Sequence, residues 1–491
     1  MSIIASGMSD PQQKSSFEQL ESGSTERPAS SKTEEASSSP KPTSRDIQTW
    51  PEWKKNMMIL MVSFHSMSST FMAAGLVPAA AGFATLYRVS LPDASYLISI
   101  QILLLGIAPI FWTVIVDRYG RHYVLIFSVL ASLVCNIGGA RCTTYAGQMI
   151  TRALTAIVIS PPIGIGSAVV VDLTTADERA RKLGWWVLMT ILGTPCGPFI
   201  MGFVVQHSQV QWIFWIYAIM NFIQAAAYLI FGGETLYFAE SEHSITERRD
   251  SGIKKYLMEL VPKRLNSRPI TVRDFFSPFV LIYKPQILAV ALATAVTFCY
   301  GNIIFVVEMP ITFGERFGLN AEQTGLQFIS VIIGCFIGEQ LAGPMSDYFM
   351  KVCRRRRGHV HPSDRLWLTY IGFLTIIAGL LIWGFQLQKT TTWNITPCVG
   401  IAVASFGNQI QSTILTAFAV DICPENSAAI GVFFNVIRLL YGFTGPFYFP
   451  YMFSTLKFTG TAGVMCGLVV VGGMIPTLIV QITSSRRRLE G

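Results

Sequence analysis

Apolar and polar residues alternate along this chain in long blocks. Between Asn56 and Ser484, stretches of about 20 predominantly apolar residues are separated by short polar segments. Twelve such stretches begin near residues 57, 93, 123, 145, 184, 211, 286, 321, 366, 395, 428 and 460. A block of this length is what a helix needs to cross the hydrocarbon core of a bilayer. The pattern therefore predicts twelve membrane-spanning helices, called spans 1 to 12 below.

The bilayer also determines the type of secondary structure. No water reaches the acyl region to satisfy loose backbone groups, so apolar stretches this long must be helices rather than open strands. The composition agrees, because 51% of the residues are hydrophobic and 13% are charged, against about 25% charged in an average soluble domain. We predict an all-α membrane protein.

The polar segments divide the chain into parts. Residues 1–50 are rich in Ser, Glu, Lys and Pro and lack an apolar core, so we expect a disordered cytoplasmic tail. The basic stretch 234–280 separates span 6 from span 7 and is predicted to be a cytoplasmic linker, helical around "IKKYLMELV". Two six-helix bundles, at 51–233 and 281–483, and a basic cytoplasmic tail at 484–491 complete the prediction.

The positions of the basic residues predict the orientation. If the first tail is cytoplasmic, 30 of the 37 Lys and Arg residues lie in the tails and inner loops. This bias is the usual topology signal of membrane proteins, and it places both termini in the cytoplasm. The net charge of +8 then follows from the inner loops and needs no nucleic-acid partner. The nine cysteines show no metal-ligand spacing, so we expect them to pack in the helices.

The chain also repeats itself. "WTVIVDRYGRH" after span 2 is echoed by "GPMSDYFMKVCRRRR" after span 8, with Asp117 opposite Asp347. A second echo aligns Asp172, at the end of span 4, with Asp421, at the end of span 10. Two related halves are therefore expected, and a duplicated bundle with a site between its halves is a design of transporters.

Three motifs carry a resemblance to a known family. "DRYGRH" (117–122) follows span 2, "GGETLY" (232–237) ends span 6, and small residues recur in span 5. The span 5 positions are Gly184, Gly193, Gly197, Pro198 and Gly202. With them the chain resembles the major facilitator superfamily, and within it the fungal branch of twelve-helix drug:proton antiporters. The chain departs from the family pattern at Thr113, Thr155, Ala156, Met201 and Gly233.

The resemblance implies a secondary active transporter, with proton-coupled export of a small organic molecule as the expected activity. Its partners would be that substrate, protons and the lipid bilayer, with no cofactor and no nucleic acid, and we expect a monomer in the plasma membrane. Facilitated or proton-coupled uptake on the same fold is an alternative, and a non-transporting receptor is another. The chain contains none of the GxxxxGK[ST], HExxH or GxSxG motifs, which argues against ATP coupling and against an enzyme.

The charged inner loops suggest a gate. The predicted gate residues are Asp117, Arg118, Gly120, Arg121 and Asp347. Gly120 permits a tight turn, and Asp117 can receive Arg121 or cap a neighbouring helix. An exposed ion pair contributes only about 0 to 1 kcal/mol, which suits a contact that is made and broken in every cycle. The alternative is a positive-inside anchor without a gating role.

The small residues of span 5 predict a hinge. Glycine removes side-chain bulk and proline bends a helix, so another helix can approach closely and pivot there. Close packing without movement is the alternative.

Ionisable residues inside the spans are the candidates for proton coupling. They are Glu339, Arg438, Arg152, Glu308 and His65. A charge at bilayer depth costs on the order of several kcal/mol unless it faces the bundle interior. We place Glu339 first, because its apolar neighbours "GCFIG" disfavour its charged form. Glu339 and Arg438 can instead neutralise each other, Glu308 can be interfacial, and His65 can be a hydrogen-bonded structural residue.

Uncharged polar residues in spans 7 and 10 are candidates for a substrate-binding lining. They are Asn302, Asn408, Gln409 and Gln411. Hydrogen bonding between helices is the alternative for all four. His359 and His361 lack further metal ligands, so a solvated loop is the better interpretation of that pair.

Overall fold

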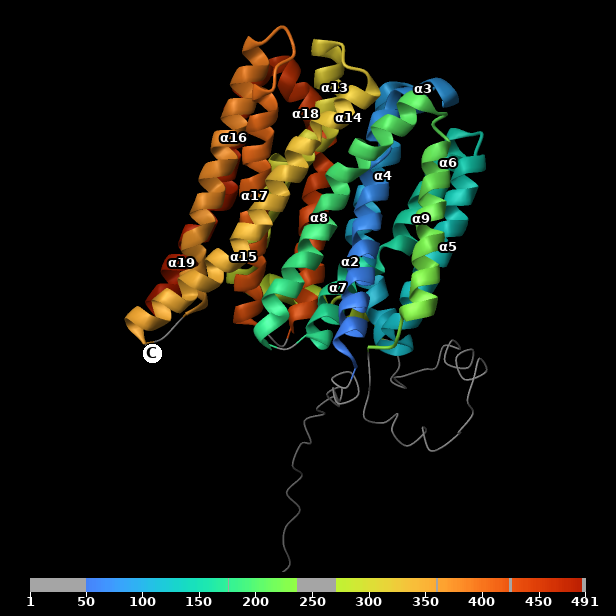
Figure 1. Ribbon diagram of the computed structural model, residues 1–491. Helices are drawn as coiled ribbons and strands as arrows, with labels where there is room; N and C mark the ends of the chain where they lie inside the picture. Colours follow the sequence, from blue (N-terminus) through green and yellow to red (C-terminus); the bar gives the residue numbers. More distant parts are fainter. Residues whose placement is uncertain (1–49, 175, 236–270, 359–360, 424–425, 488–491) are drawn as a thin grey trace, which may run out of the picture. The chain divides into compact units, whose positions relative to one another are not determined.

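The computed structural model of the chain describes residues 50–174, 176–235, 271–358, 361–423 and 426–487 (Figure 1). Every regular element in these ranges is a helix, which confirms the predicted all-α fold. Residues 1–49 and 236–270, which hold most of the predicted tail and linker and the segment "IKKYLMELV", lie outside the described residues.

The first half of the chain forms spans 1 to 6. Their helices are α2 (Glu52–Ala74) with α3 (Ala80–Tyr87), α4 (Leu91–Tyr119), α5 (Arg121–Arg141), α6 (Tyr145–Ile159) with α7 (Pro161–Leu173), α8 (Ala176–His207) and α9 (Trp212–Phe231). Two short elements, α11 (Val272–Phe275) and η3 (Ser277–Tyr283), precede the second half.

The second half forms spans 7 to 12. Spans 7 and 8 are α12 (Pro285–Phe298), η4 (Cys299–Ile303) and α13 (Ile304–Phe317), then α14 (Ala321–Gln327) and α15 (Ile329–Arg357). Spans 9 to 12 are η5 (Pro362–Leu368) with α16 (Thr369–Lys389), α17 (Thr396–Ile422), α18 (Ser427–Val469), η7 (Val470–Met474) and α19 (Ile475–Arg487). The long α18 is divided at Lys457, whose φ of 57° is not helical, so spans 11 and 12 meet there.

Local sequence explains several of these boundaries. The side chain of Ser90 accepts a hydrogen bond from the backbone N–H of Asp93 and caps α4. Gly120 ends α4 with a φ of 91°, a conformation that residues with a side chain rarely adopt, and α5 begins at the next residue. Asn320 and Gln323 form a reciprocal capping box at the start of α14.

The number of spans agrees with the prediction. Among the described residues, ten stretches are long and apolar enough to cross a membrane. One of the ten, Ala429–Ser484, contains two spans because the chain breaks at Lys457. The helix α17 is not among the ten, since Asn408, Gln409 and Gln411 lower its hydropathy, yet its 27 residues are long enough to span. The ten stretches therefore contain eleven spans, and α17 is the twelfth.

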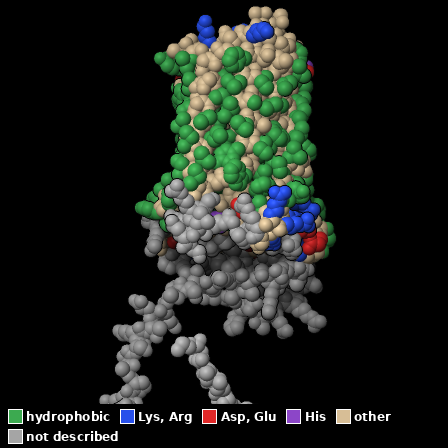
Figure 2. Space-filling view, turned by 90° about the vertical axis from the view of Figure 1, so that its left-hand side faces the viewer, with side chains coloured by type: hydrophobic (Ala, Val, Ile, Leu, Met, Phe, Trp, Pro, Cys, Tyr) green, Lys and Arg blue, Asp and Glu red, His purple; other side chains and the backbone are tan. Residues whose placement is uncertain are grey.

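The surface fits a protein within a bilayer. Figure 2 shows a band of apolar side chains between the two ends of the bundle, with Lys and Arg side chains at the ends. The first turn of α2 and the end of α19 lie at the same end (Figure 1). We call this end, which also carries the exposed side chains of Arg354, Arg355 and Arg356, the basic end.

The two halves touch on both sides of the bundle centre. Toward the basic end, Ile110 of α4 packs against Val432 and Val436 of α18 in a small apolar cluster. Toward the opposite end, the ring of Tyr96 in α4 stacks on Phe447 of α18. The halves therefore enclose the space between these two contacts.

Candidate functional site

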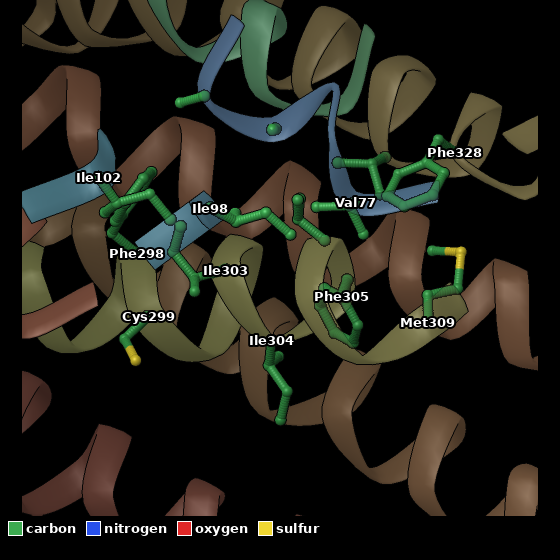
Figure 3. Packing of buried hydrophobic residues seen from close by; sticks show 14 of the residues in the cluster. Val77, Ile98, Ile102, Phe298, Cys299, Ile303, Ile304, Phe305, Met309 and Phe328 are labelled. Atoms are coloured by element: carbon green, nitrogen blue, oxygen red, sulfur yellow. The ribbon is translucent and has the colours of Figure 1, made fainter. Parts of the chain in front are cut away.

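A cavity lies between the two halves, where α2, α4 and α8 face spans 7 and 11. Its lining consists of Thr70, Ala73, Ala74, Val77, Ile98, Ile102, Leu105, Thr190, Ile191, Thr194, Phe298, Ile303, Val306, Val307, Arg438 and Leu439. Figure 3 shows part of this region, with Ile98 and Ile102 of the first half beside Phe298 and Ile303 of the second. A mostly apolar lining with a few polar groups is typical of a small-molecule site.

Arg438 of α18 is the one charged residue among the described residues that line this cavity. Its Nη2 donates to Oδ1 of Asn435 at 3.0 Å, and its guanidinium carbon lies 4.7 Å from the ring centroid of Phe298. In the described part of the chain it forms no ion pair, and its Nε has no hydrogen-bond partner. The cavity thus holds a cation whose bonding capacity is only partly used.

Glu339 of α15 lies outside this lining, at the contact between α15 and α8. Its Oε2 accepts hydrogen bonds from Nε2 of Gln409 at 2.6 Å and from the hydroxyl of Thr413 at 2.7 Å. The side chain is buried, with 7% of the residue exposed. The suggested neutralisation by Arg438 is wrong for this conformation, because each residue is bonded to neutral partners.

The small residues of span 5 contact two different neighbours. Gly193 and Gly197 press against span 1, since a Cβ on Gly197 would lie 2.7 Å from the backbone oxygen of Phe71. Gly184 and Gly202 face span 8 of the other half. A Cβ on Gly184 would lie 2.5 Å from Oε1 of Glu339, and one on Gly202 would lie 2.6 Å from the backbone oxygen of Ala321.

Pro198 belongs to the same contact between the halves. It lies inside α8, and a Cβ on Gly325 of α14 would come within 3.2 Å of its backbone oxygen. The close approach predicted for span 5 is therefore present, toward span 1 within the first half and toward span 8 across the interface. Whether span 5 also pivots stays a prediction.

Arg152 and Glu308 are buried, and some of their side-chain polar atoms have no hydrogen-bond partner among the described residues. Nη2 of Arg152 donates to the backbone oxygen of Met72 at 2.7 Å, while its Nε and Nη1 have no partner among the described residues. Glu308, 2% exposed in α13, has an Oε1 without a partner in the same ranges. Glu308 is therefore packed inside the protein, and an interfacial depth in the bilayer stays the alternative.

His65 is held inside the first half. Its Nδ1 lies 3.2 Å from the hydroxyl of Tyr228, and its Nε2 lies 3.4 Å from the hydroxyl of Ser128. Both ring nitrogens are thus within hydrogen-bond reach of neutral hydroxyls from spans 6 and 3. This geometry favours the structural alternative over a part in proton coupling.

The charges at the basic end are paired within each half, and the partner of Arg121 differs from the one suggested by the sequence. Arg121 forms an ion pair with Asp172 at the end of α7, not with Asp117. The reason is the turn at Gly120, which ends α4 at the residue before Arg121 and makes Arg121 the first residue of α5. Arg118 instead lies beside the ring of Tyr119, with 6.0 Å between its guanidinium carbon and the ring centroid.

The second half repeats this arrangement. Nε of Arg365 donates to Asp421 at 2.8 Å, and its Nη1 lies 3.4 Å from Asp347. The two echoed aspartates, Asp172 and Asp421, thus hold equivalent arginines. The described ion pairs at this end tie helices together within a half. The contacts between the halves there include the apolar cluster around Ile110 and the close approach of Gly431 in α18 to Ser167 in α7.

The four predicted lining amides are not among the residues that line the cavity. Asn302, Asn408 and Gln411 are fully buried, and their amide groups have no hydrogen-bond partner in the described ranges. Gln409 uses its Nε2 on Glu339. For Gln409 the geometry therefore favours the alternative of hydrogen bonding between helices.

Comparison with known proteins identifies the family. The model of the Major Facilitator Superfamily matches residues 59–446. The chain belongs to this superfamily. Its members are membrane transporters, so this chain is a transporter of small molecules, and the duplicated halves and central cavity are those of a superfamily member.

Two curated fungal members are similar over most of their length. A probable efflux pump, mfs2, of Aspergillus flavus is 25% identical over 410 residues, which cover 79% of this chain and 92% of that protein. Citrate exporter 1 of Aspergillus niger is 24% identical over 489 residues, with 92% of each chain covered.

A solved structure supports the fold. The crystal structure of the human organic anion transporter MFSD10 (TETRAN) matches with a TM-score of 0.57 and 15% identity, covering 87% of this chain and 99% of that one.

Sequence reasoning missed two features of this superfamily member. One is a group of hydroxyls, in which the Tyr300 oxygen lies 3.1 Å from that of Tyr441 and 3.0 Å from that of Tyr448. The π-helical segment Cys299–Ile303 contains Tyr300, and no periodicity in the sequence marked it.

The second missed feature is Glu234, which accepts hydrogen bonds from the backbone N–H groups of Arg121 and His122 and so caps α5. The "GGETLY" motif was the available signal.

Proposed function

We propose that this protein is a secondary active transporter that exports a small organic molecule in exchange for protons, by alternating access to the cavity between its halves. Small-molecule transport follows from the superfamily, while direction and proton coupling are the proposal. The names of the two fungal relatives, an efflux pump and an exporter, support export. The span 5 glycines and proline resemble the antiporter signature, which favours export over uptake.

The observation that carries the proposal is the position of Glu339. Its carboxylate lies at the contact of α15 with α8, so it belongs to one half and touches the other at Gly184. Among the described residues it has no cationic partner. A charge at such depth costs on the order of several kcal/mol, and binding a proton removes that cost. Movement of the halves apart would expose the carboxylate to water, where it can release the proton.

The other predicted residues have supporting parts in this proposal. Asp117, Arg118, Gly120, Arg121 and Asp347 shape the basic end, where the halves must part to open the cavity inward. Span 5 would pivot on its contacts at Gly184 and Gly202 while Gly193 and Gly197 keep it joined to span 1. Arg152, with two unused donors, and the unpartnered carboxylate of Glu308 are secondary candidates for proton coupling.

We place the protein in the plasma membrane as a monomer, with the basic end and both termini in the cytoplasm. The bias of Lys and Arg toward the tails and inner loops supports this orientation. Export in this orientation would load the cavity from the basic end and release substrate at the opposite end.

A two-step experiment tests the proposed function. Metabolites in medium and cells are compared with and without the protein, and a compound whose release depends on it is then given to vesicles that contain the purified protein. Accumulation in vesicles that are acidic inside, and not in vesicles without a pH gradient, is the expected result. No protein-dependent release would contradict transport, and equal movement with and without the gradient would leave a facilitator instead.

A further inference from the structure

We infer that the cavity takes its substrate as an organic anion, with an oxyanion such as a carboxylate on Arg438 and an apolar body against the opposite wall. This inference rests on the proposed function and names the class of molecule that the same cavity transports.

The surroundings of Arg438 hold its guanidinium in place and leave donors free. Nη2 of Arg438 donates a hydrogen bond to Oδ1 of Asn435 at 3.0 Å, and the guanidinium lies over the ring of Phe298. The Nδ2 of Asn435 in turn lies 3.4 Å from the backbone oxygen of Leu105 in the first half. Asn435 therefore positions the arginine from the interface, and the remaining donors are left for a ligand. Fixed, planar donors of this kind match a carboxylate.

The charge balance of the cavity selects the sign of the ligand. Its described lining contains one cation and no carboxylate. The carboxylate of Glu339 lies outside the lining and is bonded to Gln409 and Thr413. A buried charge without a counter-ion is unfavourable, so a bound anion would supply the missing charge and a bound cation would add repulsion. The site therefore favours anions over neutral and cationic molecules of equal shape.

The rest of the lining selects an apolar body. Ile98, Ile102 and Leu105 form one wall, and Ile303 and Val306 face them from span 7. The lining contains three hydroxyls, and those of Thr70 and Thr190 donate to the backbone oxygens of Thr190 and Trp186. Among the described residues only the hydroxyl of Thr194 is left for a ligand. One hydroxyl and one guanidinium cannot satisfy the many hydroxyls of a sugar, so a sugar fits poorly, whereas a molecule with one charged end and a hydrocarbon or aromatic end fits well.

Binding to the purified full-length protein tests the inference with three probes of nearly the same shape. They are 1-naphthylacetate, which is an anion, 1-naphthylacetamide, which is neutral, and 2-(1-naphthyl)ethylamine, which is a cation at pH 7. We expect the anion to bind roughly 10- to 100-fold more tightly than the amide, since a charged hydrogen bond replaces a neutral one, and the amine to bind most weakly. Equal binding of the three, preference for the amine, or no binding of the anion would overturn the inference.

Three variants test whether Arg438 causes the preference for the anion. Arg438→Gln should remove the difference between anion and amide, and Arg438→Lys should keep part of it because the charge remains. The exposed Arg141, at the end of α5, provides the matched control, and Arg141→Gln should bind as the wild type does. An anion preference that survives in Arg438→Gln would contradict the assignment.

The outcome is separable from that of the proposed function. If the protein releases neutral or cationic compounds from cells, transport stands and the inference fails. If the anion binds preferentially and nothing is transported, the inference stands and the proposed function fails.

Discussion

The carboxylate of Glu339 in span 8 occupies the space that a side chain on Gly184 of span 5 would need. The distance from a Cβ at Gly184 to Oε1 of Glu339 would be 2.5 Å, so the Glu339 side chain must shift before residue 184 can carry a side chain. Residue 184 belongs to the first half and residue 339 to the second. The relationship therefore connects the glycine signature of span 5 with the carboxylate that we propose to carry the proton.

This relationship predicts the effect of Gly184→Ala. The added methyl group would displace the terminal carboxylate of Glu339 and disturb its hydrogen bonds to Gln409 and Thr413. We expect transport to fall roughly 10-fold or more, with the amount of folded protein in the membrane retained. Transport rates at matched surface amounts check it. Gly463→Ala in span 12, where an added Cβ meets nothing within 4 Å, is the control and should transport normally.

Substitutions at Gly197 and Gly202 should affect different properties, the stability of the first half and the balance between conformations. A Cβ on Gly197 would meet backbone atoms of span 1 in the same half, at Phe71 and Gly75, so Gly197→Ala should destabilise that half by about 1 to 3 kcal/mol. A Cβ on Gly202 would meet Ala321 of the other half, so Gly202→Ala should shift the balance of inward and outward states. Thermal unfolding should respond mainly to the first, and labelling of cysteines placed in the cavity mainly to the second. The opposite assignment would contradict these packing roles.

The charged loop at the basic end is testable in the same way. Gly120→Val places a β-branched residue at a φ of 91°, and Asp117→Asn removes a charge at the end of α4. Both should lower transport severalfold through the balance between conformations, while membrane delivery is retained. Wild-type rates in both variants, at equal surface amounts, would reduce the motif to a topology anchor.

Topology is predicted from the basic residues and can be tested directly. Tags at either terminus should resist an impermeant reagent on intact cells and react after permeabilisation. A cysteine introduced near Asn320, at the opposite end of the bundle, should react without permeabilisation. Reaction of either terminal tag on intact cells would contradict a cytoplasmic basic end.

The spans and the duplication were predictable because both leave a one-dimensional signal. Apolar length predicts spans, and even α17, which Asn408 and Gln409 make more polar, is visible as one. The pairing of Asp172 with Arg121 was not predictable, because the partners are 51 residues apart and meet only after α5 and α7 pack. The echo with Asp421 marked the aspartate and gave no information about its partner.

The candidate site was predictable in its residue types and not in its geometry. Sequence reasoning selected Glu339 and Arg438 as charges at bilayer depth, and both lie where the two halves meet. The sequence could not show which of the two faces the cavity, because the depth of a residue along a helix does not determine the direction of its side chain. Arg438 faces the cavity on one side of span 11, whereas Glu339 faces span 5. The placement of Tyr300 next to Tyr441 depends on a π-helical segment, for which the sequence has no periodic signature.

The most direct test of proton coupling through Glu339 is Glu339→Gln in reconstituted vesicles with an imposed pH gradient. Glutamine keeps the shape and can accept hydrogen bonds from Gln409 and Thr413, but it cannot titrate. We expect the variant to lose gradient-driven accumulation of the exported compound and still to exchange it downhill, while the wild type accumulates it and Glu308→Gln behaves as the wild type. Accumulation by Glu339→Gln equal to that of the wild type would contradict the account, and its loss in Glu308→Gln alone would move the proton site to Glu308.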